Sequence, residues 1–171
     1  MVNTTKIHNA GRAAKLFTLF FSFILILYFN SHLYAQNAIF RAGASTANIT
    51  PPLGSGLVGN FGVPPPANYV HDELHARSLV LDDGTTKLVF VVVDNVGVIR
   101  EVFDEAKRLI LEETKIPTAQ ILISSDHTHS ASSASGIGEI RGGWNAGRPL
   151  DDYQRFLVRR IADGVRIALN N

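Results

Sequence analysis

Residues 87–94 read KLVFVVVD, a run of six consecutive apolar residues that ends in the carboxylate of Asp94. β-Branched and aromatic residues of this kind favour a strand. An apolar run without alternation is typical of a strand that is covered on both faces of its sheet. We therefore expect residues 87–93 to form a central, fully covered strand.

The residues before this run predict a hairpin. Ser78–Leu81 is a second strand-forming segment, and Asp82–Thr85 between the two supplies an Asp-Gly turn. Further upstream, residues 39–44 predict a first short strand, which the prolines of Ile49–Pro52 close because proline cannot donate to a ladder.

The residues after the run predict a crossover. Residues 99–113 carry apolar side chains on one helical stripe and charges opposite, and Pro117 ends that region. Residues 120–125 then form the next strand. Residues 87–125 are therefore a β-α-β unit, whose strands should be parallel and joined by a right-handed crossover.

The chain is expected to end in a second helix. Asp151 is placed as its N-cap, and the apolar stripe continues to Asn170. The arginines of this helix are expected to form a solvated face: Arg155, Arg159, Arg160 and Arg166. The predicted fold class is α/β, a mixed sheet with a β-α-β unit and flanking helices.

Two histidines follow the second parallel strand, in the stretch SSDHTHS of residues 124–130. In an extended segment His127 and His129 point to the same side, so both can converge on a metal ion. The alternative is a polar loop after a strand. The carboxyl ends of parallel strands are where α/β proteins build ligand sites, which favours the first interpretation.

Two carboxylates are expected beside these histidines. Asp94 ends one parallel strand and Asp126 follows the other, so both face one crevice if the strands are neighbours. There they would orient the imidazoles or share the metal. The alternative for Asp94 is the N-cap of the helix that begins after it.

Two glycine-rich segments flank, in the sequence, the residues expected to line this crevice. Residues 53–68 hold a density of Gly and Pro that predicts no regular structure, and they form either a ligand loop or a surface excursion. Residues 130–148 carry Trp144, which either lies in a lid or fills the core. His71 and His75 are interpreted as surface residues.

The N-terminus predicts export. Residues 1–35 place Lys6, Arg12 and Lys15 before an uncharged apolar segment, which is the layout of a signal peptide with a cut after Ala35. An uncleaved signal anchor is the alternative. We expect a secreted or periplasmic protein, or a membrane-anchored one if the signal stays.

Composition narrows the function classes of residues 36–171. The leader holds three basic and no acidic residues, so removing it changes the formal net charge from +1 to −2 and leaves nothing that suggests nucleic acid. The chain has no cysteine, so a metal site must use His, carboxylate, Tyr or water. No phosphate-binding glycine loop followed by Lys-Ser/Thr is present.

The order of these motifs resembles the N-terminal region of neutral (alkaline, non-lysosomal) ceramidases, over residues 40 to about 170. The resemblance rests on five stretches: residues 42–52, the glycine loop with Gly59, residues 71–81, the strand that ends in Asp94, and the strand that enters His127–Ser130.

The resemblance implies a zinc-dependent amidase that cleaves ceramide to sphingosine and a fatty acid. It implies that His127 is a zinc ligand, that His129 is the catalytic or substrate-side group, and that Gly59 lies near the site. It further implies a lipid-like amide substrate, association with a membrane surface, and an incomplete catalytic domain in residues 36–171 that needs a missing C-terminal portion of the same enzyme.

The sequence departs from the family at the histidine motif, where Asp126 replaces a Thr and Ala131-Ser132 replaces Gly-Pro. A catalytic zinc takes three or more protein ligands, and His127 even with Asp94 or Asp126 would hold it poorly. The alternative function is a noncatalytic exported binding or surface module that has lost the metal site.

Overall fold

The structure is a computed structural model that describes residues 17–25, 39–58, 65–132, 134 and 149–171. The chain divides into two units, Met1–Ile39 and Phe40–Asn171. In the first unit a helix covers residues 17–25, inside the predicted apolar part of the leader. Across the described ranges, no helix has both the length and the apolar character needed to span a membrane.

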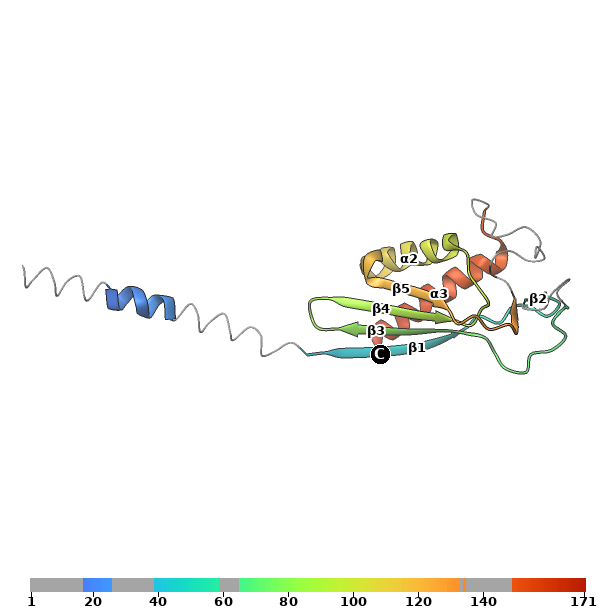
Figure 1. The fold of residues 1–171 in the computed structure, drawn as a ribbon, viewed down its shortest axis with the longest axis horizontal. Helices are drawn as coiled ribbons and strands as arrows, with labels where there is room; N and C mark the ends of the chain where they lie inside the picture. Colours follow the sequence, from blue (N-terminus) through green and yellow to red (C-terminus); the bar gives the residue numbers. More distant parts are fainter. Residues whose placement is uncertain (1–16, 26–38, 59–64, 133, 135–148) are drawn as a thin grey trace, which may run out of the picture. The chain divides into compact units, whose positions relative to one another are not determined.

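The second unit is built on a four-stranded mixed sheet in the order β1-β3-β4-β5 (Figure 1). The strands are β1 (Arg41–Asn48), β3 (His75–Asp82), β4 (Lys87–Val93) and β5 (Ile121–Ser125). β1 and β4 both pair antiparallel with β3, and β5 pairs parallel with β4. The predicted mixed sheet and the parallel strands of the β-α-β unit are confirmed.

The hairpin between β3 and β4 forms where the Asp-Gly turn predicted it. The Asp83 carboxylate accepts hydrogen bonds from the backbone N–H groups of Thr85 and Thr86, at 2.9 and 2.7 Å. Gly84 has a φ of 89°, a left-handed conformation that glycine adopts without steric cost. The turn is therefore determined by local chemistry.

The two long helices begin and end close to the predicted positions. α2 (Arg100–Thr114) buries Val102, Ala106 and Ile110, as its apolar stripe predicted. α3 (Asp152–Asn170) begins at the predicted N-cap Asp151, whose side chain accepts from the backbone N–H of Gln154 at 2.7 Å. The Gln154 side chain in turn accepts from the N–H of Asp151, which completes a capping box.

α3 packs on one face of the sheet with its backbone close to β1 and β3. A Cβ added at Gly43 would lie 1.9 Å from the carbonyl oxygen of Ala168, and one at Gly164 would lie 3.0 Å from Oγ of Ser78. The hydroxyl of Ser45 donates to the carbonyl of Gly164 at 2.6 Å. Small residues on both elements therefore permit this contact.

The predicted covering of β4 on both faces is wrong within the described residues. Its side chains alternate between buried and exposed, because both α2 and α3 pack on the same face of the sheet. Side chains on the other face form an apolar surface that we call the open sheet face. It contains Leu79 (38% exposed), Leu88 (42%), Phe90 (37%), Val92 (41%) and Leu122 (58%).

Three smaller expectations also need correction. The first strand begins at Arg41 and continues to Asn48, because its pairing with β3 extends over eight residues. The glycine-rich loop is not wholly irregular, since β2 (Leu57–Val58) pairs with β6 (Ala131–Ser132). On α3, Arg160 is not simply solvated, because its Nε donates to the carbonyl of Asn48 at 2.9 Å.

Candidate functional site

The ends of β4 and β5 bring the two predicted carboxylates together. Val93 pairs with Ser125 at the last position of the parallel ladder, and the N–H of Asp126 then donates to the carbonyl of Val93 at 3.1 Å. One residue on, the N–H of Asn95 donates to the Asp126 carboxylate at 3.3 Å. Asp94 and Asp126 therefore lie at the same edge of the sheet, as the parallel pairing predicted.

Asp94 is buried (7% exposed) and is held by two donors. The N–H of His75 donates to its Oδ2 at 2.8 Å, and the guanidinium of Arg77 donates to its Oδ1. Burial raises the pKa of Asp94, but these hydrogen bonds and the charge of Arg77 outweigh it and leave the pKa below its ordinary value. Asp94 does not cap α2, because the N-cap is Ile99.

His127 is fixed by the turn that follows β4. Its backbone has a φ of 67°, a left-handed conformation that is uncommon outside glycine. Its N–H donates to the carbonyl of Asn95 at 3.0 Å, and its ring Nδ1 lies 2.5 Å from the carbonyl oxygen of Val96. A carbonyl can only accept, so Nδ1 carries a proton, and in the neutral ring Nε2 then holds the lone pair. This tautomer is the one that a metal ligand with a backbone partner requires.

His129 lies beside His127. The ring centroids are 5.0 Å apart, and the planes meet at 75°. Both residues are exposed. The two rings are therefore close together, as predicted, although the backbone at His127 is left-handed where we expected an extended conformation.

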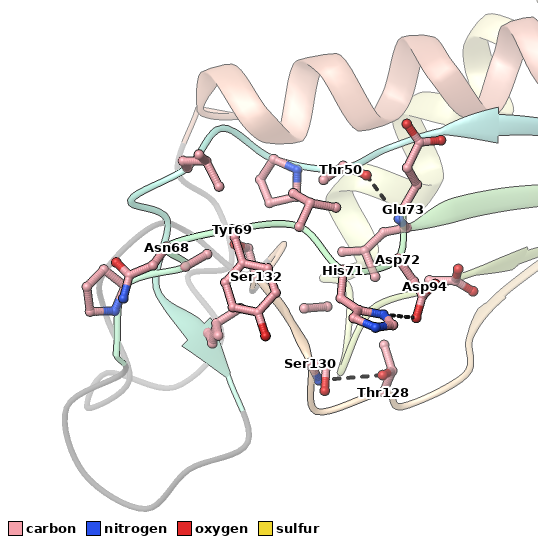
Figure 2. A pocket seen from close by; sticks show the side chains of 18 of the residues that line it. Thr50, Asn68, Tyr69, His71, Asp72, Glu73, Asp94, Thr128, Ser130 and Ser132 are labelled. Atoms are coloured by element: carbon pink, nitrogen blue, oxygen red, sulfur yellow. Dashed lines mark hydrogen bonds and ion pairs between the residues drawn. The ribbon is translucent and has the colours of Figure 1, made fainter.

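A cavity of about 850 Å³ lies next to residues 126–132, the segment after β5 that we call the histidine loop. Figure 2 shows side chains from residues 68–73, from Thr50 and from the loop after β5 around it. Its described lining includes Arg77, Asp94 and Asp126, and the hydroxyls of Thr128 and Ser130. The described lining does not include the two histidines, which alternate with these hydroxyl residues along the chain.

The cavity also has an apolar part. It is lined by Leu53, Leu57, Pro66, Val70 and Leu74. A space that joins an apolar wall to charged and hydroxyl groups suits an amphipathic ligand.

The described residues supply one suitable zinc ligand and not a complete zinc site. His127 offers an exposed Nε2 of the correct tautomer. Nowhere in the described ranges, this site included, is there a group of three or more His, Cys, Asp or Glu residues that could hold a metal ion. Catalytic zinc ordinarily needs three protein ligands.

Two contributors to the site were missed from the sequence, Arg77 and Asn95. The signal for Arg77 was a charged residue within a strand-forming segment, and that for Asn95 was a second polar residue directly after Asp94. Of the predicted residues, Gly59 and Trp144 lie outside the described residues.

No protein-family model matches the chain, and none of the curated proteins does. Solved structures do match. One is a neutral ceramidase from Pseudomonas aeruginosa, with 18% sequence identity and a TM-score of 0.63 over 80% of this chain. Another is a ceramidase complexed with C2, with 19% identity and a TM-score of 0.61 over 79% of this chain.

The chain spans 22% of the length of each of these two structures. At such low identity the likeness concerns the fold, and it confirms the fold that the sequence motifs predicted. The mixed α/β sheet and its flanking helices have the fold of part of a neutral ceramidase structure.

Proposed function

We propose that this chain is the N-terminal part of an exported zinc-dependent amide hydrolase that cleaves the N-acyl bond of ceramide or of a similar lipid amide. The observation that carries the proposal is the hydrogen bond from Nδ1 of His127 to the carbonyl of Val96. It leaves Nε2 available at the sheet edge where α/β folds bind ligands. The match to ceramidase structures supports the substrate class.

In this proposal each part of the site has a role. His127 binds zinc through Nε2, and His129 contacts the substrate or carries a proton. When bound, zinc would lower the pKa of its water ligand and polarise the amide carbonyl. Water adds to the carbonyl carbon, the C–N bond breaks, and the products are a fatty acid and a sphingoid amine. The remaining zinc ligands would come from other parts of the enzyme.

The cavity fits the proposed substrate chemically. Its apolar wall would bind an acyl or sphingoid chain, and the hydroxyls of Thr128 and Ser130 would bond to polar groups of the ceramide head. Arg77 and Asp94, which also line the cavity, form an ion pair.

The test measures zinc content and ceramide hydrolysis of the complete gene product. His127→Ala should lose both zinc and activity. His129→Ala should keep zinc while turnover falls by about 10²-fold or more, as for loss of a proton-transfer group. Arg108→Ala, an exposed change on α2, is the control and should alter neither.

The alternative is a noncatalytic exported binding module that has lost the metal site. A gene product without zinc or amidase activity, in which His127→Ala changes nothing, would establish this alternative.

We also propose export, with signal cleavage after Ala35. Sequencing of the mature N-terminus from the secreted or periplasmic fraction should begin at Gln36. A protein that retains Met1 and sediments with membranes would instead be an anchored form.

A further inference from the structure

Asn95 is a polar side chain in the core, with 0% of its surface exposed. Its Nδ2 donates to the carbonyl of Ser132 at 2.7 Å. Its Oδ1 accepts from the N–H groups of Gly97 and Ala134, at 3.3 and 3.4 Å. A buried amide is stable only when such partners are present, so these bonds connect the turn after β4 to the far end of the histidine loop.

The backbone of Asn95 holds the near end of the same loop. Its N–H donates to the Asp126 carboxylate at 3.3 Å, and its carbonyl accepts from the N–H of His127 at 3.0 Å. The next carbonyl, that of Val96, accepts from the His127 ring. One buried residue therefore contacts the loop before the histidines and after them.

These bonds also explain why His127 keeps a left-handed backbone. A residue with a φ of 67° is held there by surrounding contacts, because the conformation is sparsely populated otherwise. If the side chain of Asn95 no longer held Ser132 and Ala134, the loop could relax and the ring would lose the Val96 carbonyl.

We propose that Asn95 is a positioning residue that sets the tautomer and orientation of His127, so that Nε2 is the nitrogen presented to a metal ion. The metal-binding part of this inference rests on the proposed function. The positioning part does not, because it concerns a hydrogen bond of the protein itself.

The first measurement is the tautomer of His127 in the 171-residue chain, from the ¹⁵N shifts of the ring at about pH 8.5, well above the ordinary pKa of histidine near 6.5. The wild-type ring should carry its proton on Nδ1. A ring protonated on Nε2, or one that exchanges between the two forms, would overturn the proposal whatever the variants do.

The second measurement compares Asn95→Asp with Asn95→Ala. Asn95→Asp keeps the acceptor for Gly97 and Ala134 but loses the donor to Ser132, and Asn95→Ala loses all three bonds. Both should shift His127 toward a tautomeric mixture, Asn95→Ala further. Titration of the complete gene product with Zn²⁺, followed at the His127 ring, should show that both variants lower the affinity by about 10-fold or more.

Ile110→Val, a change in the core near the far end of α2, is the control for lost stability. It should leave the tautomer and the zinc affinity unchanged. If it shifts the tautomer as much as Asn95→Asp does, the proposal is wrong.

The failure of this inference differs from that of the proposed function. A Nδ1-protonated His127 that depends on Asn95, in a complete gene product that binds no Zn²⁺, confirms the positioning role and contradicts the metal site. Zinc binding that is insensitive to both Asn95 variants supports the metal site and contradicts the positioning role.

Discussion

The guanidinium of Arg77 on β3 donates a hydrogen bond to the carboxylate of Asp94, directly past the end of β4. Asp94 is buried, whereas the Arg77 side chain is half-exposed. Removing the cation leaves a carboxylate with low exposure and one hydrogen-bond partner fewer, which costs free energy.

Arg77→Ala should therefore lower the free energy of unfolding by about 1–3 kcal/mol, less than for a fully buried pair because water reaches Arg77. Urea unfolding measures this. Arg100→Ala, which breaks an exposed pair with Asp104, is the control and should cost about 0.5 kcal/mol or less. Equal losses for the two variants would contradict the assigned role of Asp94.

The same pair predicts a dependence of stability on acid pH. The pKa of Asp94 is lower in the folded protein than its ordinary value. Its contribution is therefore present above the unfolded pKa, near 3.9, and is lost as pH falls through the folded pKa. Asp94→Asn should reduce the acid-induced loss of stability below about pH 4. Other carboxylates with lowered pKa values will maintain part of that loss.

The buried hydroxyl of Tyr153 predicts that the free energy of unfolding depends on pH in the alkaline range. Its hydroxyl donates to the carbonyl of Ile49 at 3.0 Å, and burial raises its pKa to about 12. The folded pKa lies above the unfolded one, so its contribution is complete below about pH 10 and is lost as pH rises through the folded value.

Tyr153→Phe should cost about 1–2 kcal/mol at neutral pH, because the Ile49 carbonyl loses its donor. It should also remove the decline in stability between about pH 10 and 12. Chemical denaturation across that range tests both points. A variant whose alkaline decline matches the wild type would show that Tyr153 ionises without penalty.

The capping box gives a prediction for α3. Asp151→Ala should lower the free energy of unfolding by about 1 kcal/mol, because the N–H of Gln154 loses its acceptor. Asp152→Ala removes an exposed carboxylate one residue later and is the matched control, with an expected change below about 0.5 kcal/mol.

The open sheet face predicts that the chain binds hydrophobic dyes and associates with itself. Phe90 and Val91 are neighbours on β4, one on the open sheet face and one in the core. Phe90→Thr should reduce the binding of a hydrophobic dye and the self-association of the 171-residue chain, with little change in the free energy of unfolding. Val91→Thr should instead destabilise by about 1–3 kcal/mol, because it buries a hydroxyl. The reverse pattern would mean that the two faces are assigned wrongly.

The fold was predictable where the chain carries local signals. The Asp-Gly turn, the stripe of α2 and the cap at Asp151 each act over a few residues, and each was confirmed. The covering of β4 was not predictable, because an apolar run has the same sequence whether its second face meets this polypeptide or another layer.

The site was predictable only in part. Parallel strands bring Asp94 and Asp126 to one edge, and this follows from the β-α-β pattern. The left-handed backbone of His127 does not follow from its neighbours, because it depends on carbonyls about thirty residues away in the chain. Whether the two histidines bind zinc stays a prediction.

The anchoring of His127 uses main-chain oxygens of Asn95 and Val96. Every amino acid brings such an oxygen, so exchange of the Val96 side chain leaves that acceptor in place. Residue 96 can therefore change and still aim the imidazole the same way, whereas residue 95 cannot, because the Asn95 side chain also holds Ser132 and Ala134.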